Sequence, residues 1–169
     1  MAHDLHDDGR LDETRPLHEL VTGTPPVAMV MTMVGDTHTS RPVTVAQVEH
    51  SRLSFLASHQ ADWVQAVASG SAIVHVTLAS DAHTTYLSLN GTATVSDDPA
   101  LKQRLWSAPA KAWFAGPDDP DLAVVHFDLT DGRYWDGPDG LIGRGLAMLR
   151  AAMGSDGGTG RSGAIGTSG

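Results

Sequence analysis

Nine histidines are among the side chains in this chain that could do chemistry. Metal-binding proteins usually place such residues at short fixed spacings, but neither H-x-H nor H-E-x-x-H occurs here. His3 and His6 lie in an acidic N-terminal stretch, whereas His75 and His126 fall within predicted strands. We therefore expect these histidines to be surface or hydrogen-bonded residues, and we expect no metal site.

Covalent catalysis has little support in the sequence. Cysteine is absent, which excludes disulfides, thiolate chemistry and iron–sulfur clusters. We identify no Ser-His-Asp order and no paired carboxylates, so no catalytic side chain can be named. Redox work stays open, because a bound cofactor can carry the electron chemistry itself.

The charge balance narrows the possible partners. The chain has 11 Lys and Arg against 20 Asp and Glu, a net charge of −9. Nucleic-acid binding needs clustered positive charge, so we expect no nucleic-acid partner. No apolar run reaches the roughly 18–20 residues of a membrane helix, and the N-terminus lacks a signal-peptide core. We therefore expect no membrane partner and a cytoplasmic location.

The segments that must position any site are mostly strand-like. Apolar and β-branched runs bounded by turn residues predict strands at Val27–Val34, Ser40–Val48, Leu53–Ala57, Ala72–Leu78, Tyr86–Val95, Leu122–Leu129 and Gly132–Trp135. Apolar spacing and capping residues predict helices at Pro16–Val21, at Asp62–Ala68, after Asp97 or Asp98, and at Leu141–Met153. Antiparallel strands with a few inserted helices indicate a mainly β protein, a small barrel with peripheral helices.

The predicted domain is flanked by two low-complexity ends. Residues 1–15 read as a disordered acidic arm, and residues 154–169 as a Gly- and Ser-rich flexible tail. The barrel domain is expected to span residues 16–153.

Several segments resemble one family. Ser40-Arg41-Pro42-Val43 is similar to the S-R-P-M segment of pyridoxamine 5'-phosphate oxidase-like split barrels, in their general stress protein branch. Residues 86–93 (YLSLNGTA) resemble that branch's Y-V-S-V-S-G-T-A strand. Residues 105–122, with their KAWF and DDPDL pieces, and residues 134–136 and 146–154 resemble its later segments.

The resemblance implies a six-stranded antiparallel split β-barrel of the flavin-binding type, a homodimer with FMN in clefts at the subunit interface. Carried over by position, the implied cofactor-binding residues are Arg41, Pro42, Val43, Ala57, Ser58, Trp63 and Trp113. Arg41, Pro42 and Val43 would border the ring and ribityl chain. Ala57 and Ser58 would lie at the polar edge, and Trp113 would come from the partner subunit.

The implied phosphate-binding stretch departs from the family pattern T-S-x-x-S-x-K. Residues 57–63 read ASHQADW, so Ala57, Ala61 and Trp63 replace Thr, Ser and Lys. Hydrogen bonds to a charged group contribute about 1.5–3 kcal/mol each, so these losses would weaken phosphate binding. Arg41, Ser58, His59 and the helix N-terminus near Ala61 could compensate in part.

The residues themselves allow simpler interpretations. Arg41 could be an ordinary surface arginine, and Trp63 could be a core residue beside Val64 and Val67. Trp106, Trp113 and Trp135 could pack in a dimer interface, where aromatic residues are enriched.

Two functions therefore remain open from the sequence. The first is an FMN-binding oxidoreductase acting on a small organic substrate. The second is a non-enzymatic, stress-related binding protein whose cleft is degenerate or holds another planar cofactor, such as a deazaflavin or haem.

Overall fold

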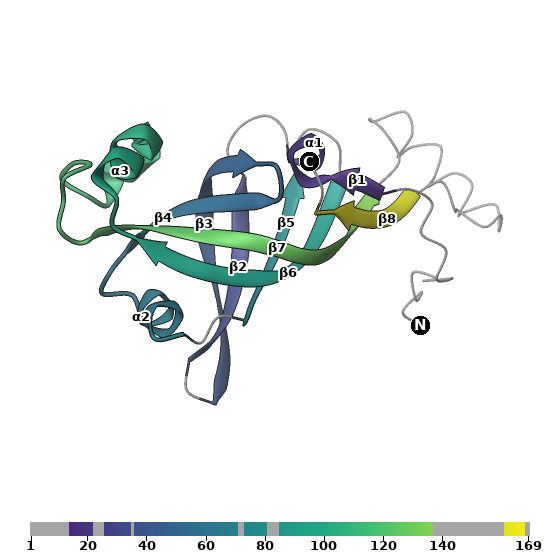
Figure 1. Cartoon of the computed structure of the whole chain (residues 1–169), viewed down its shortest axis with the longest axis horizontal. Helices are drawn as coiled ribbons and strands as arrows, with labels where there is room; N and C mark the ends of the chain where they lie inside the picture. The colour runs from purple at the N-terminus through teal and green to yellow at the C-terminus, as the bar shows by residue number, and fades with distance from the viewer. Residues whose placement is uncertain are drawn as a thin grey trace, which may run out of the picture.

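Six antiparallel strands close into a barrel in the computed structural model, which describes residues 14–21, 26–34, 36–70, 73–80, 85–136 and 161–167. The barrel strands are β2 (Val27–Val34), β3 (Thr37–Glu49), β4 (Arg52–Ser58), β5 (Ile73–Ser80), β6 (Thr85–Ser96) and β7 (Leu122–Asp136). Their order is β7-β4-β3-β2-β5-β6, and β6 pairs with β7 to close the barrel (Figure 1). The predicted six-stranded split barrel is confirmed.

Side-chain alternation explains why these segments form a barrel. In β6, Leu87, Leu89, Gly91 and Ala93 are buried, whereas the residues between them are exposed or half-buried. Successive side chains of a strand point to opposite faces, so this pattern gives each strand one apolar face. The apolar faces meet in a core whose largest fully buried side chains include Tyr134, Phe55 and Phe127.

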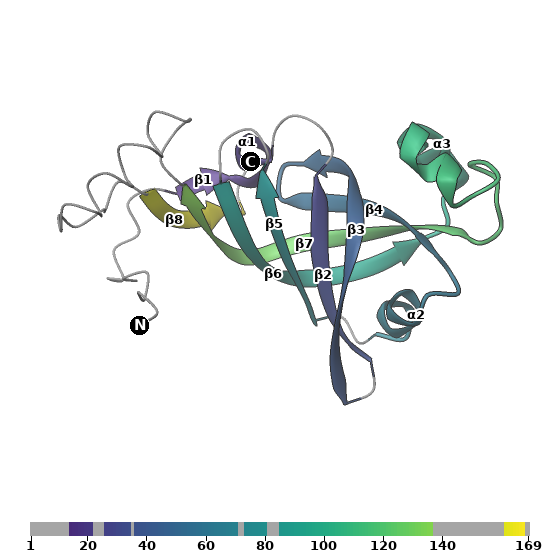
Figure 2. The same ribbon diagram turned by 180° about the vertical axis from the view of Figure 1, so that it is seen from behind.

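The helices gather mainly at one end of the barrel. α2 (Asp62–Ala68), α3 (Pro99–Leu105) and the 3-10 helix η1 (Ala108–Ala112) lie there, and the short α1 (Leu17–Leu20) lies at the other end (Figures 1 and 2). α2 has the predicted bounds. α3 begins as predicted, because the Asp98 side chain accepts a hydrogen bond from the backbone N–H of Ala100 at 2.9 Å. No helix within the described ranges is long and apolar enough to cross a membrane.

β7 is one continuous strand, so the prediction of two separate strands there was wrong. The pairing of β6 with β7 shifts between Asn90 and Gly91 and leaves one extra residue, Thr130, in β7. Such a bulge bends a strand without ending it. A Cβ at Gly91 would lie 2.2 Å from the backbone O of Asp128, so only glycine fits this close approach.

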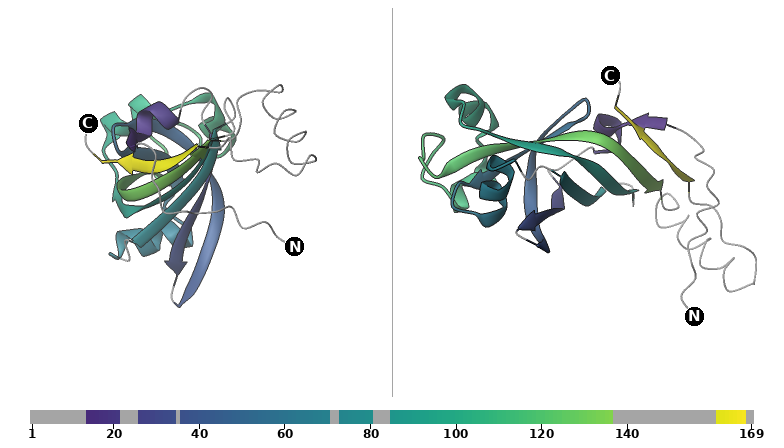
Figure 3. Two further views of the ribbon diagram at one scale, coloured as in Figure 1. Left: turned by 90° about the vertical axis from the view of Figure 1, so that its right-hand side faces the viewer. Right: turned by 60° about the horizontal axis from the view of Figure 1, so that its bottom comes forward.

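The sheet continues beyond the barrel at the end opposite α2 (Figure 3). β8 (Arg161–Gly166) pairs with the last residues of β7, and β1 (Thr14–Pro16) pairs in parallel with β8. This differs from the expectation that residues 154–169 form a flexible tail and that the arm extends to residue 15. Ile165 is the apolar contact that holds β8, with only 4% of its surface exposed. The predicted helix at Leu141–Met153 lies outside the described residues.

Candidate functional site

A cavity of about 640 Å³ lies against β3 and the end of β4. Its remaining walls come from Val27 of β2, from Trp63 of α2, from the segment between Ser107 and Phe114, and from Asp121. β3 and β4 are antiparallel neighbours, so residues of the two strands reach the cavity side by side although they are far apart in the chain. Cavities of about 300–1,000 Å³ are typical of small-molecule sites.

All the residues that the resemblance implied as cofactor contacts line this one cavity: Arg41, Pro42, Val43, Ala57, Ser58, Trp63 and Trp113. Three come from β3, two from the end of β4, one from α2 and one from the residue that ends η1. The structure thus brings them together, and their role in binding a cofactor stays a prediction.

Trp113 lines the cavity of its own chain, whereas the resemblance assigned it to the partner subunit. The segment around it is fixed by backbone contacts to the end of β4. The N–H of His59 donates to the backbone O of Asp121 at 2.8 Å, and the N–H of Gln60 donates to the Asp121 carboxylate at 3.3 Å. These bonds hold the segment that follows η1 against the residues after β4. Trp113 lies at the edge of the cavity and remains 84% exposed.

The turn between Trp113 and β7 is organised by one carboxylate. Asp119 accepts hydrogen bonds from the backbone N–H groups of Ala115 and Asp121, both at 2.9 Å. These two donors lower the pKa of Asp119, because they favour the ionised form. The turn therefore carries a fixed negative charge.

Arg41 enters the cavity wall from β3 and is held by its own barrel. Its guanidinium donates to the hydroxyl of Thr32 at 2.7 Å, to the backbone O of Val30 at 3.3 Å, and to the hydroxyl of Thr39. Burial lowers the pKa of Arg41, and the charge of Asp62 opposes that shift. The interpretation of Arg41 as an ordinary surface residue is therefore wrong, since it is half-buried and has three hydrogen-bond partners.

Trp63 combines the two roles that the sequence left open. Its side chain is only 6% exposed and packs in the core with Val64 and Val67. Its ring also lines the cavity, and the guanidinium carbon of Arg41 lies 5.6 Å from the ring centroid, within the range of a cation–π contact. Trp63 therefore links the cavity wall to the core.

An ionic cluster beside the cavity was not foreseen from the sequence. Asp97, at the end of β6, contacts Nε2 of His59 at 2.6 Å and Nζ of Lys102 at 3.0 Å. The hydrogen bond from His59, followed by that from Lys102, lowers the pKa of Asp97. The Lys102 side chain is nearly buried, and its ammonium charge is paired with the Asp97 carboxylate.

The two strand histidines have partners across the sheet. His75 contacts Asn90 at 2.7 Å, and His126 contacts Ser54 at 3.0 Å. Burial is the main cause that lowers the pKa of His126. Within the part of the chain that the structure describes, no three His, Asp or Glu side chains are placed to hold a metal ion.

The donor set of the cavity suits a flat ring better than a phosphate. Pro42, Val43 and the two tryptophans offer apolar surface, and the hydroxyls of Ser58, Thr44 and Ser107 also line the wall. A flavin ring with a polar edge fits such a wall. Among the described lining residues, the only formal charges are those of Arg41 and Asp121.

Several lining residues were missed at the sequence level: Val27, Thr44, Ala46, Leu56, Ser107, Pro109, Ala110, Phe114 and Asp121. Phe114 and Asp121 lie within the KAWF and DDPDL pieces. The resemblance therefore covered these two residues but assigned them no place in the cavity wall. The others are small or apolar residues whose position on a cavity wall depends on how the strands pair.

Comparison with known proteins places the sequence beside one family. The sequence pattern of the family described as "Pyridoxamine 5'-phosphate oxidase like" matches residues 12–157. General stress protein 26 of Bacillus subtilis (strain 168) is 32% identical over 63 residues, which are 36% of this chain and 45% of that protein. The match thus spans less than half of that relative's length.

Two crystal structures share the fold. General stress protein 26 from Bacillus anthracis str. Sterne is 20% identical with a TM-score of 0.62, over 70% of this chain and 89% of that one. The general stress FMN/FAD binding protein from Xanthomonas citri is 24% identical with a TM-score of 0.60, over 69% of this chain and 84% of that one. Since the family pattern covers most of the sequence, the chain belongs to the pyridoxamine 5'-phosphate oxidase like family.

Proposed function

We propose that this chain binds a flavin, with FMN as the expected form, and acts as a flavin-dependent oxidoreductase on a small organic substrate. The observation that carries the proposal is that Arg41, Pro42, Val43, Ala57, Ser58, Trp63 and Trp113 all line one cavity of about 640 Å³. The fold is also that of a Xanthomonas citri protein described as FMN/FAD binding.

The chain's own residues would bind and orient the ring. Pro42, Val43 and Trp113 would cover apolar ring surface, and the hydroxyl of Ser58 would meet the polar edge. The Ser58 oxygen already accepts the N–H of Gln60 at 3.0 Å, which leaves its O–H free to donate. A bound flavin would supply the electron-transfer chemistry, which explains why no catalytic side chain is needed for it.

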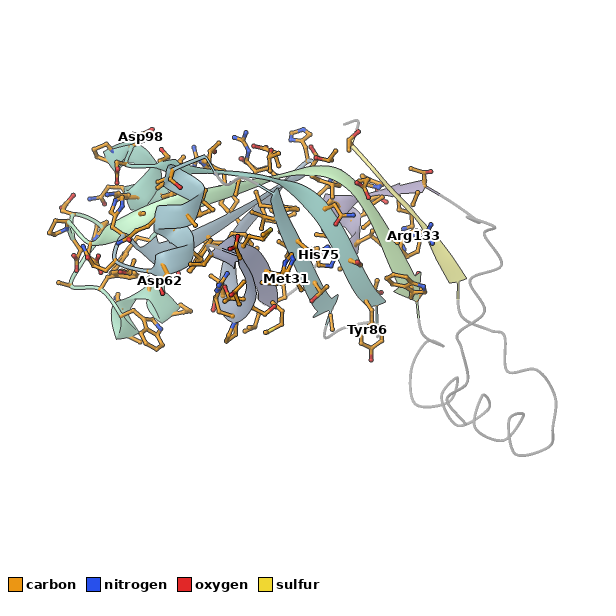
Figure 4. The ribbon with its side chains drawn as sticks, turned by 90° about the horizontal axis from the view of Figure 1, so that it is seen from below. Met31, Asp62, His75, Tyr86, Asp98 and Arg133 are labelled. Carbon is orange, nitrogen blue, oxygen red and sulfur yellow. The ribbon has the colours of Figure 1, made fainter. Side chains whose placement is uncertain are left out.

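We also propose that the protein functions as a homodimer. The outward face of β2 exposes Val27, Met29 and Met33, and β6 and β7 expose Tyr86 and Trp135 on the outer face of the same sheet. Figure 4 shows Met31, His75 and Tyr86 along β2, β5 and β6 on this side. Large exposed apolar areas usually mark interaction surfaces. Val27 also lines the cavity, so a second copy packed on this face would lie at the cavity's edge.

The proposal is tested by the absorption spectrum and mass of the full chain purified without added cofactor, followed by titration with FMN. We expect either a flavin absorption band or saturable quenching of added FMN fluorescence. Protein that shows no flavin band and leaves FMN fluorescence unchanged would refute flavin binding.

A non-enzymatic binding role is the second candidate. One observation favours it: Arg41, the single cation that lines the cavity among the described residues, is engaged by Val30, Thr32 and Thr39. Turnover of a nicotinamide donor by the flavin-loaded protein would exclude this role. Tight binding of a deazaflavin or haem in place of FMN would instead identify a different planar cofactor.

A further inference from the structure

We infer that this cavity recognises the ring and the hydroxyl-bearing chain of a flavin but not its terminal phosphate, so that riboflavin binds about as tightly as FMN. The inference rests on the proposed flavin-binding function and specifies its ligand class. It follows from the charges and hydrogen bonds around the cavity.

The cavity wall has no net charge within the described residues. Arg41 and Asp121 are its only formal charges, and they have opposite signs. A phosphate dianion is usually held by positive side chains or by several N–H donors. The wall therefore offers a dianion little net attraction.

Arg41 is the only cation among the described lining residues, and most of its donors bind its own barrel. Three of its five N–H donors bind the backbone O of Val30 and the hydroxyls of Thr32 and Thr39. Its guanidinium also lies over the ring of Trp63. These bonds, one of them to the buried Thr32, hold the guanidinium against the barrel, and its positive charge is offset by the negative charge of Asp121 in the same cavity wall.

The lysines of α3 and η1 are not among the lining residues. Lys102 is bound to Asp97, which also binds His59. Lys111 is exposed on η1 and does not line the cavity. Neither supplies a cation to the cavity wall.

The surrounding charges oppose an added dianion. Asp62 adjoins Trp63, and the turn before β7 contains Asp119 and Asp121. The carboxylate of Asp119 is held in its ionised form by two backbone N–H groups. The whole chain carries a net charge of −9, which adds to this negative field.

The polar groups that remain suit an uncharged ligand. The hydroxyls of Thr44, Ser58 and Ser107 line the cavity beside apolar Pro42, Val43 and Trp113. Hydroxyls bind ring carbonyls, ring nitrogens and ribityl hydroxyls as donors or acceptors without needing a charge. These features are shared by riboflavin and FMN.

The test is a comparison of FMN and riboflavin, each titrated separately into the full-length protein and followed by quenching of flavin fluorescence at low and high salt. We expect dissociation constants within about threefold of each other, and FMN binding that does not weaken as salt rises. FMN binding tenfold or more tightly, with affinity falling as salt rises, would overturn the inference but leave the proposed function intact. Failure of both flavins to bind would overturn both.

A charge-removal variant gives a second measurement. Asp121→Asn removes the negative charge from the cavity wall and keeps the oxygen that accepts the N–H of Gln60. We expect the preference for FMN over riboflavin to rise about two- to fivefold, and a thermal melt of the variant checks its folding. Asp118→Asn, at an exposed position outside the cavity wall, is the matched control. An equal rise in both variants, or in neither, would contradict the inference.

Discussion

Trp113 is 84% exposed although it is a large apolar side chain at the edge of a cavity. We predict that Trp113→Ala weakens flavin binding by about tenfold, because the loss of ring contact costs about 0.5–1.5 kcal/mol beyond the lost area. The melting temperature should not change, since the side chain packs against little. Fluorescence titration and a thermal melt check both parts. Lys111→Ala, at an exposed position in η1 that does not line the cavity, is the control, and equal losses in the two variants would disprove the assignment.

Asp97 gives a prediction on pH. The pKa of Asp97 is lowered in the folded protein. The ionised carboxylate therefore stabilises the fold at pH values above the ordinary pKa of aspartate. This stabilisation is lost as the pH falls through the lowered pKa. Because the carboxylate is exposed, Asp97→Asn should cost only about 0.5 kcal/mol at neutral pH. Denaturant unfolding at neutral and acidic pH measures this cost. The cost should shrink toward zero in acid, and a cost that grows in acid would show that another group dominates.

The family resemblance predicted part of the cavity wall, but it did not predict the contacts that the charged residues make. Arg41, Ser58 and Trp113 could be found because they lie in recognisable local segments. The contacts of Arg41 with Thr32, and of Asp97 with His59 and Lys102, could not be found in this way. They depend on which strand ends meet in space, and no local pattern records that.

At the scale of elements, local patterns worked where one face of a segment is buried. β6 and α2 were predicted closely because their apolar residues repeat with the strand and helix periods. β8 could not be predicted, since a glycine-rich stretch with one apolar residue has no period. Its pairing depends on the free edge of β7, which only the folded barrel provides.

Ile165 tests whether β8 is part of the folded unit. We predict that Ile165→Ala lowers the free energy of unfolding by about 2–4 kcal/mol, because it removes a buried side chain from the core. Chemical denaturation measures this loss. Thr167→Ala, just beyond β8 and exposed, should change stability little. An Ile165→Ala protein as stable as the wild type would show that β8 does not pack on the barrel in solution.

At the scale of the whole molecule, the exposed face of β2 bears on assembly. We predict that the wild type sediments as a dimer, and that Met29→Glu combined with Met33→Glu shifts it toward monomer, since charge in an apolar interface is costly. Thr37→Glu, exposed at the start of β3, is the control for added charge. A wild type that sediments as a monomer at all concentrations would exclude the dimer.

The most direct test of the central claim is a crystal structure of the full chain grown with saturating riboflavin. The flavin ring is expected in the cavity lined by Pro42, Val43, Trp63 and Trp113. A well-resolved cavity that contains no flavin density would contradict the claim that this cavity is a flavin site. A flavin bound only at another surface would contradict it as well.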